Sequence, residues 1–261
     1  GYGLYAAAAL TIDGGTVEAT GGNIGVYSAT SITIDGCSVE ATGTNNIGIS
    51  SGGAVLIKKT VESATLSVTA TGKNKGIDAT DDVTVTGGTL IANGTDAEAL
   101  TAKTISLTSV TVTADGANGI YASNSNLEIS DGSVTATASS GTGLSASNGI
   151  TVNGGEVNAT STSNDAINAK TVSLTDAIVT AEGVNGIYAG DGDLSISGGN
   201  VDATGTGDEG RGLYASGLID ISDESLVTAF GNLYGIYSQS NITIDGCTVE
   251  ATGTNNIGIS S

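Results

Sequence analysis

A short pattern recurs along the whole chain at a nearly constant interval. Each occurrence is a glycine, an aliphatic residue, a variable residue and then alanine or serine, as in "GLYA" at residue 3 and "GIYS" at residue 235. In two of the twelve occurrences Ala99 and Ala166 replace the glycine, and the mean spacing is about 23 residues. A fixed period of this length predicts a solenoid, in which each repeat forms one coil of a stack.

Within each repeat, apolar and polar residues alternate with period two, which is typical of short β-strands with one buried face. Two more strands of this kind follow in each repeat, such as "LSISGG" at residue 194 and "VDATG" at residue 201. Glycine pairs such as Gly14–Gly15 separate them, and glycine tolerates the positive φ of a sharp corner. We therefore expect an all-β fold, a right-handed parallel β-helix (β-solenoid) of about 11 coils of about 23 residues, with three short strands per coil.

Two segments far apart in the chain are nearly identical. Residues 32–51 and 242–261 differ only at Ser38 and Thr248, and residues 1–23 resemble residues 210–232. Solenoids grow by duplication of whole coils. We therefore expect residues 1–261 to be a single β-solenoid stretch, part of a longer tandem array with a super-repeat of about 210 residues. Neither end has a polar capping segment, which predicts continuation of the array or end-to-end self-association through the terminal coils.

The regular spacing is interrupted once, between residues 51 and 75, where the interval grows to 28 residues. The insertion contains "VLIKKTVESATL" and four of the six lysines. A longer corner loop and a short surface helix are both compatible with this segment.

Composition excludes several classes of function. The chain has 27 acidic and 7 basic residues, a net charge of −20. Nucleic-acid binding needs clustered Lys and Arg, so we expect no nucleic-acid partner. No apolar run is long enough to cross a bilayer, so we expect no membrane insertion. Cys37 and Cys247, the only cysteines, lie nine coils apart, roughly 43 Å by strand spacing. This separation predicts no disulfide between them.

The same composition argues against catalysis. Without histidine, neither a Ser-His-Asp triad nor a histidine-bound metal is possible. The adjacent acidic pairs, such as Asp223–Glu224, each lie within one loop and cannot face each other across a substrate bond. Arg211 is the only arginine, and we expect it to pair with its neighbours Asp208 and Glu209. The sequence therefore predicts that the protein is not an enzyme.

Coils such as "GIYASNSNLEISDGSVTATASSGTGLSASNGITVNGGEVNAT", residues 119–160, resemble a known family. They are similar to the secreted bacterial, clostridial-type, right-handed parallel β-helix repeat proteins described as carbohydrate-binding. The resemblance covers the whole chain. It implies an extracellular setting, no catalysis, contact with polysaccharide and bound calcium.

Six of the eight tyrosines occupy the variable, outward position of the recurring pattern, so their rings are expected to stack about 4.8 Å apart along one face. These candidate carbohydrate-binding residues are Tyr5, Tyr27, Tyr121, Tyr188, Tyr214 and Tyr237. One interpretation is a flat aromatic strip for sugar rings or a neighbouring rod. The other is a ladder that only stiffens the rod, and the sequence does not choose between them.

A second candidate site is the segment "AGDGDLSIS" at residues 189–197, which resembles half of a calcium-binding β-roll motif. Asp191 and Asp193 are its candidate metal ligands. Because the motif binds through stacked copies and occurs here once, the sequence favours a glycine-rich acidic turn over a calcium site. No cofactor is required by this sequence, and calcium is the one it allows.

Together these features predict a non-catalytic, secreted or cell-surface β-solenoid that acts as a stiff structural and adhesive rod or filament. The alternative is a dedicated polysaccharide-binding module that uses the tyrosine strip, assisted by calcium. For an anionic polysaccharide, repulsion from the acidic chain predicts a bridging cation.

Overall fold

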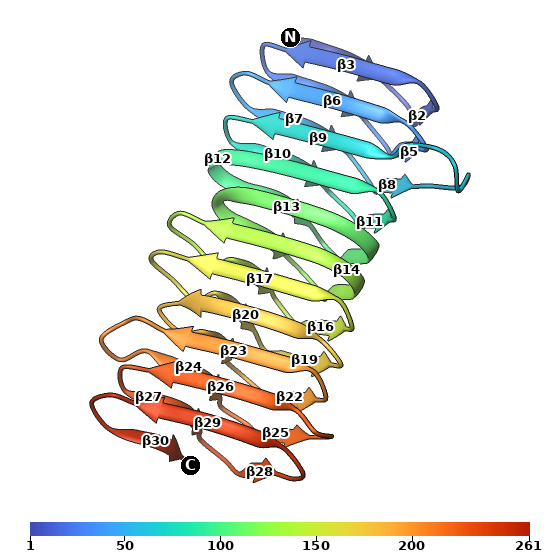
Figure 1. Ribbon diagram of the computed structural model, residues 1–261. Coiled ribbons are helices and arrows are strands. Elements are labelled where there is room, and N and C mark those ends of the chain that lie inside the picture. Colours follow the sequence, from blue (N-terminus) through green and yellow to red (C-terminus); the bar gives the residue numbers. More distant parts are fainter.

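The chain forms a right-handed parallel β-helix without α-helices, as the repeat predicted. The computed structural model describes residues 1–261, which form a rod with the two termini at opposite ends (Figure 1). Every pair of hydrogen-bonded strands is parallel, and each strand pairs with the equivalent strand of each neighbouring coil. No helix exists that is long and apolar enough to span a membrane.

Each coil has three strand positions, which follow one another around the rod. The strands at the first position, which carry the recurring glycine pattern, are β1 (Tyr2–Ala6), β4 (Ile24–Ser28), β7 (Ile47–Ser51), β10 (Lys75–Ala79), β15 (Leu144–Ala146), β18 (Ile167–Ala169), β21 (Ile187–Ala189), β24 (Arg211–Ala215), β27 (Tyr234–Ser238) and β30 (Ile257–Ser260). Those at the second position are β2 (Leu10–Asp13), β5 (Ile32–Asp35), β8 (Val55–Lys58), β11 (Val83–Thr86), β16 (Gly149–Asn153), β19 (Thr171–Thr175), β22 (Leu194–Ser197), β25 (Ile219–Ser222) and β28 (Ile242–Ile244). Those at the third are β3 (Thr16–Gly21), β6 (Ser38–Gly43), β9 (Ser67–Gly72), β17 (Glu156–Ser161), β20 (Ile178–Gly183), β23 (Asn200–Gly205), β26 (Leu226–Gly231) and β29 (Thr248–Gly253).

Near the middle of the rod the strands continue around the corners. The three long strands there are β12 (Thr89–Ala102), β13 (Ile105–Ala122) and β14 (Leu127–Ala138), and each covers two or three of the positions. With these included, the coils number about 12 and repeat about every 22 residues, in agreement with the sequence period.

The strand register confirms the alignment derived from the repeat. Leu4 pairs with Val26, and the column continues through Ile120 to Ile259 without a slip. Aliphatic residues of this column and of the other two strand positions form one continuous core cluster of 61 buried residues. Alternation of period two thus placed the core correctly, because each coil covers the apolar residues of its neighbours.

The recurring glycine has a steric cause. A Cβ atom at Gly48 would lie 2.6 Å from the Thr71 backbone nitrogen and 2.7 Å from the Gly76 carbonyl oxygen. First- and third-position strands therefore approach too closely for a side chain at most coils. The predicted glycine corners are also present, since Gly14 and Gly15 have φ of 68° and 76°.

The insertion after residue 51 is a loop and not a helix. Val55–Lys58 form strand β8, which continues the second-position column, and residues 59–66 form a loop that projects from the rod (Figure 1). Both cysteines are free, as predicted; Cys37 is buried and Cys247 is half-buried.

Candidate functional site

All six tyrosines predicted as a binding strip lie on the outer surface of the first-position strands, here called the tyrosine face. The register places Tyr5 beside Tyr27 and Tyr188 beside Tyr214, which in turn pairs with Tyr237. Tyr121 has no tyrosine neighbour in the column, because Thr101 and Ser145 flank it. The tyrosine face therefore has two clusters and one isolated ring.

The N-terminal tyrosine cluster consists of Tyr2, Tyr5 and Tyr27. The rings of Tyr5 and Tyr27 are stacked, with centroids 5.5 Å apart and planes 15° apart. Tyr2 packs against both at 5.1 and 5.2 Å. The sequence analysis missed Tyr2, which belongs to a second column three residues before the predicted one. The signal for it in the sequence was the spacing of three residues from Tyr2 to Tyr5, which recurs from Tyr234 to Tyr237.

The C-terminal tyrosine cluster consists of Tyr188, Tyr214, Tyr234 and Tyr237. Tyr188 and Tyr214 are stacked with centroids 4.4 Å apart, Tyr214 and Tyr237 are 5.9 Å apart, and Tyr234 lies 4.7 Å from Tyr237. Tyr214, in the middle, is only 6% exposed. Burial, followed by the neighbouring Tyr188 hydroxyl, raises the pKa of Tyr214.

This stacking limits what the clusters can bind. A ring in the middle of a stack has both faces covered by its neighbours, so Tyr214 has no free face for a sugar ring. Free ring faces are expected only where a stack ends beside a smaller residue. The expected flat strip is thus interrupted, and its usable surfaces lie at the ends of the stacks.

Such an end is found between Tyr121 and Tyr188, where the column holds Ser145 and Asn168 instead of tyrosines. The gap forms a groove of about 360 Å³, a size typical of small-ligand sites. Its lining, here called the Tyr121–Tyr188 groove, consists of Tyr121, Ser145, Ala146, Ser147, Asn168, Ala169, Lys170, Tyr188, Gly190 and Asp191. Two aromatic side chains therefore flank a floor of hydroxyl and amide groups.

A buried network fixes the floor of the groove. The Asn168 Nδ2 donates a hydrogen bond of 2.7 Å to the Asp165 carboxylate, which also accepts one from Asn185 Nδ2 at 2.7 Å. Asp165 and Asn185 are 7% and 8% exposed. One N–H of the Asn168 amide is engaged, so its second N–H and its carbonyl oxygen are the groups available to a ligand. Lys170 forms no ion pair, unlike Lys58, Lys73, Lys75 and Lys103.

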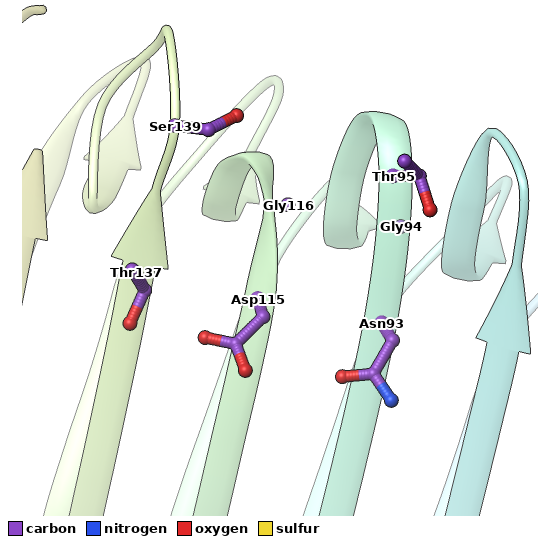
Figure 2. A pocket seen from close by; sticks show the side chains of 7 residues that line it. All are labelled: Asn93, Gly94, Thr95, Asp115, Gly116, Thr137 and Ser139. Atoms are coloured by element: carbon purple, nitrogen blue, oxygen red, sulfur yellow. The ribbon is translucent and has the colours of Figure 1, made fainter. Parts of the chain in front are cut away.

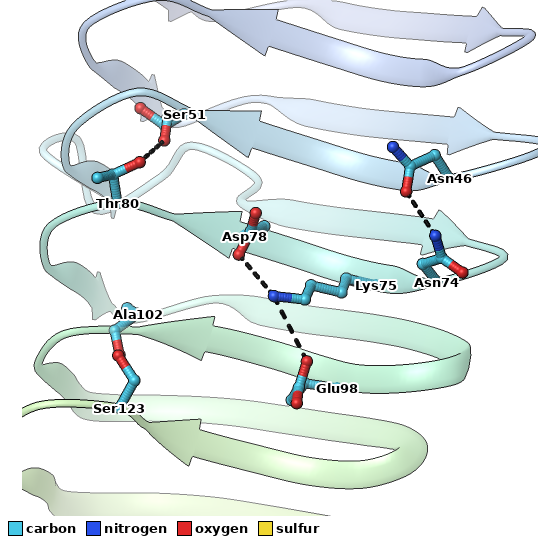
Figure 3. Close-up of polar contacts among 9 residues, drawn as sticks. All are labelled: Asn46, Ser51, Asn74, Lys75, Asp78, Thr80, Glu98, Ala102 and Ser123. Carbon is cyan, nitrogen blue, oxygen red and sulfur yellow. Dashed lines mark hydrogen bonds and ion pairs between the residues drawn. The ribbon is translucent and has the colours of Figure 1, made fainter. Parts of the chain in front are cut away.

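Between Tyr27 and Tyr121 the tyrosine face is closed by charged contacts (Figure 3). Lys75 Nζ lies 3.0 Å from Asp78 and 3.4 Å from Glu98, on the two columns that carry tyrosines at both ends of the rod. Neighbouring coils are also joined by polar bonds, such as that from Asn74 Nδ2 to Asn46 Oδ1. The polar side chains of this region form ion pairs and hydrogen bonds with one another, so few of them remain free to bind a ligand.

The two predicted calcium ligands have separate surroundings. Asp191 lines the Tyr121–Tyr188 groove, whereas Asp193 Oδ1 accepts a hydrogen bond of 2.7 Å from the Leu218 amide and so caps a turn. No group of three or more His, Cys, Asp or Glu side chains is arranged to hold a metal ion. The two residues do not form a calcium site by themselves, and calcium binding stays a prediction.

A second hollow, of about 400 Å³, lies at the edge between the third- and first-position strands (Figure 2). Its lining is wholly polar or glycine: Asn93, Gly94, Thr95, Asp115, Gly116, Thr137 and Ser139. Asp115 is its only charged residue. The sequence analysis did not find this hollow, since none of its residues belongs to the recurring pattern, and it offers no aromatic surface.

The expectation that Arg211 pairs with its neighbours Asp208 and Glu209 is wrong. Arg211 forms no ion pair with Asp208 or Glu209; instead its guanidinium lies over the rings of Tyr214 and Tyr237, at 5.3 and 5.5 Å. A guanidinium over an aromatic ring is attracted by the negative ring face. The loop that carries the two acids is exposed, so pairing would hold mobile side chains for little gain.

Comparisons of the chain with protein-family models, with curated proteins and with solved structures found no match. The resemblance to clostridial-type carbohydrate-binding proteins therefore stays a prediction, and the function has to be inferred from the rod and its groove.

Proposed function

We propose that this protein is a non-catalytic, secreted or cell-surface rod that adheres to polysaccharide through the Tyr121–Tyr188 groove. The observation that carries the proposal is the groove itself, where two tyrosines flank hydroxyl and amide groups on a rigid face. Sugar rings present apolar faces and many hydroxyl groups. A site with aromatic sides and a polar floor matches both.

The scaffold suits a mechanical role. A parallel β-helix fixes each coil by main-chain hydrogen bonds to its neighbours, and its core is continuous along the rod. Side chains on such a scaffold are held at the strand spacing, which favours a polymer with its own regular repeat. Self-association through the terminal coils is part of the proposal, because stacked coils share their core and their strand edges.

The absence of catalysis is proposed on chemical grounds. The chain has no histidine to act as a general base, and the groove contains only one carboxylate, Asp191. Glycoside hydrolysis needs two carboxyl groups on opposite sides of the bond. A groove of this composition suits binding.

Pull-down on a panel of insoluble polysaccharides tests the proposal. The double variant Tyr121→Ser, Tyr188→Ser is expected to lose at least about 90% of the bound fraction, since loss of two such contacts exceeds a tenfold change in affinity. Phe230→Ser removes an exposed aromatic ring from a third-position strand and should bind as the unchanged protein does. Circular dichroism checks that each variant keeps its β-structure.

Variants at other tyrosines test whether the groove or the stacked rings bind the polysaccharide. The double variant Tyr5→Ser, Tyr27→Ser disrupts the N-terminal tyrosine cluster and leaves the groove intact. Equal losses in both double variants would place binding on the whole tyrosine face. If the unchanged protein binds no polysaccharide on the panel, the adhesive part of the proposal is wrong and the structural rod remains.

A further inference from the structure

The only arginine of this acidic chain has no carboxylate partner. Arg211 lies on β24 at the end of a loop that contains Asp208 and Glu209, yet no ion pair forms. Its Nε atom is buried and has no hydrogen-bond acceptor. An arginine usually meets carboxylates through its planar fork of donors, so this side chain has unused binding capacity.

The surrounding tyrosines hold the guanidinium in place. Tyr214 and Tyr237 lie beneath it at 5.3 and 5.5 Å, and Tyr234 is its partner in the strand register. Of the guanidinium nitrogens only Nε is buried without a partner, which leaves the two terminal nitrogens as the accessible donors. A fixed fork of this kind is suited to a planar oxyanion that accepts two parallel hydrogen bonds.

We propose that Arg211, set in the C-terminal tyrosine cluster, binds a carboxylate group of an acidic polysaccharide. The proposal rests on the proposed function, and it names the class of sugar as a uronate. The sugar ring would lie against Tyr234, the last ring of the stack, while its carboxylate receives the two terminal N–H groups of Arg211. No metal ion takes part in this contact.

The chain's charge does not prevent such binding. At about 0.15 M salt the Debye length is about 8 Å, so exposed carboxylates elsewhere on the rod are largely screened from the site. A direct, bidentate contact is screened much less. This distinguishes the Arg211 site from a calcium bridge, because binding at Arg211 survives a chelator.

The N-terminal tyrosine cluster provides an internal comparison. Tyr2 occupies the place that Arg211 has in the related coil, with Tyr5 and Tyr27 in the places of Tyr214 and Tyr237. The two clusters thus share one stacked pair of rings, and only the C-terminal tyrosine cluster has a cation and the further rings of Tyr188 and Tyr234. Only the C-terminal tyrosine cluster is expected to select a charged sugar.

The test compares polygalacturonate with the same polymer after methyl esterification, in chelator and about 0.15 M salt. Affinity electrophoresis of the unchanged chain should show about tenfold tighter binding to the free-acid polymer, a typical gain for one charge-assisted contact. Arg211→Gln should abolish that preference, and Arg211→Lys should retain only part of it. Lys73→Gln makes the same charge change at an exposed residue and should leave the preference unchanged.

Two outcomes would overturn the inference: equal binding of both polymers by the unchanged chain, or an undiminished preference in Arg211→Gln. Retention of neither polymer would instead contradict the proposed function, so a second measurement addresses Arg211 directly. A single arginine gives one assignable guanidinium signal in NMR. That signal should shift on titration with galacturonate and not with galactose; no difference between the two sugars would rule out the site.

Discussion

Residues 32–51 and 242–261 have almost the same sequence and the same strands, but they differ in burial. Both fold into a second-, a third- and a first-position strand: β5, β6 and β7 in one copy, and β28, β29 and β30 in the other. Ile34 is fully buried, whereas its counterpart Ile244 is 41% exposed. Ile49 and Ile259 differ in the same way, at 0% and 42%.

The cause is the number of neighbouring coils. Strand β5 pairs with β2 on one side and β8 on the other, whereas β28 pairs only with β25. A coil of a solenoid cannot bury its own apolar residues, because its interior is shared with the coils above and below. The local sequence therefore determines where a strand forms and whether each side chain points inward or outward. The presence of neighbouring coils determines how much of that side chain is buried.

The largest expected effect of this difference is on stability. Ile34→Asp places a charge in the core without a partner and should cost several kcal/mol in the free energy of unfolding. Ile244→Asp places the same charge at a half-exposed position and should cost about 1 kcal/mol or less. Urea unfolding of the two variants, followed by circular dichroism, measures both values. Equal losses would mean that the terminal coil of the 261-residue chain is covered in solution.

The thiols of the two copies should differ in reactivity. Cys37 is 1% exposed, and burial raises its pKa, so little thiolate is present and little of it is accessible. Cys247 is half-buried. We expect Cys247 to react with a thiol reagent at least about tenfold faster than Cys37 at neutral pH.

Single variants assign the two reaction phases. Cys247→Ser should retain only the slow phase, and Cys37→Ser only the fast one. If both thiols react at one rate, the end of the rod either opens together with the interior or is as protected as the interior.

The sequence predicted the scaffold in detail and the site in part. The strand register could be predicted from the repeat period, the recurring glycine and the alternation of apolar and polar residues. These features depend only on contacts within one coil or between neighbouring coils. They placed Leu4, Ile120 and Ile259 in one column correctly. The same reasoning found the six outward tyrosines, since outward direction follows from alternation.

Features that depend on side-chain packing between coils were missed. Neither the burial of Tyr214 within its stack nor the position of Arg211 over two rings follows from alternation. The groove had a signal, because Ser145 and Asn168 interrupt the tyrosine column. The sequence alone does not show that this interruption forms a groove. The structure shows that neighbouring rings cover each other, so that a smaller residue leaves the adjacent ring face exposed.

The smallest expected effect concerns the aspartate at the end of the second-position segment in each copy, Asp35 and Asp245. The Asp35 carboxylate accepts hydrogen bonds from the Thr60 backbone at 2.9 Å and the Thr60 hydroxyl at 2.6 Å, and Lys58 lies 3.5 Å away. These contacts tie the inserted loop to β5. No hydrogen bond or ion pair involves the side chain of Asp245, the counterpart in the second copy.

The Thr60 hydrogen bonds, followed by the charge of Lys58, lower the pKa of Asp35. A carboxyl whose pKa is lowered in the folded state stabilises that state above its unfolded pKa, about 3.9, and loses this contribution as the pH falls through the folded value. Asp35→Asn should therefore raise amide exchange in residues 59–66 at neutral pH, and the difference from the unchanged chain should disappear in strong acid. Asp245→Asn removes the matching charge and should leave exchange in that loop unchanged at every pH. A loop equally protected in all three proteins would show that the Asp35 contacts do not hold it, and that the insertion packs on the rod by its own side chains.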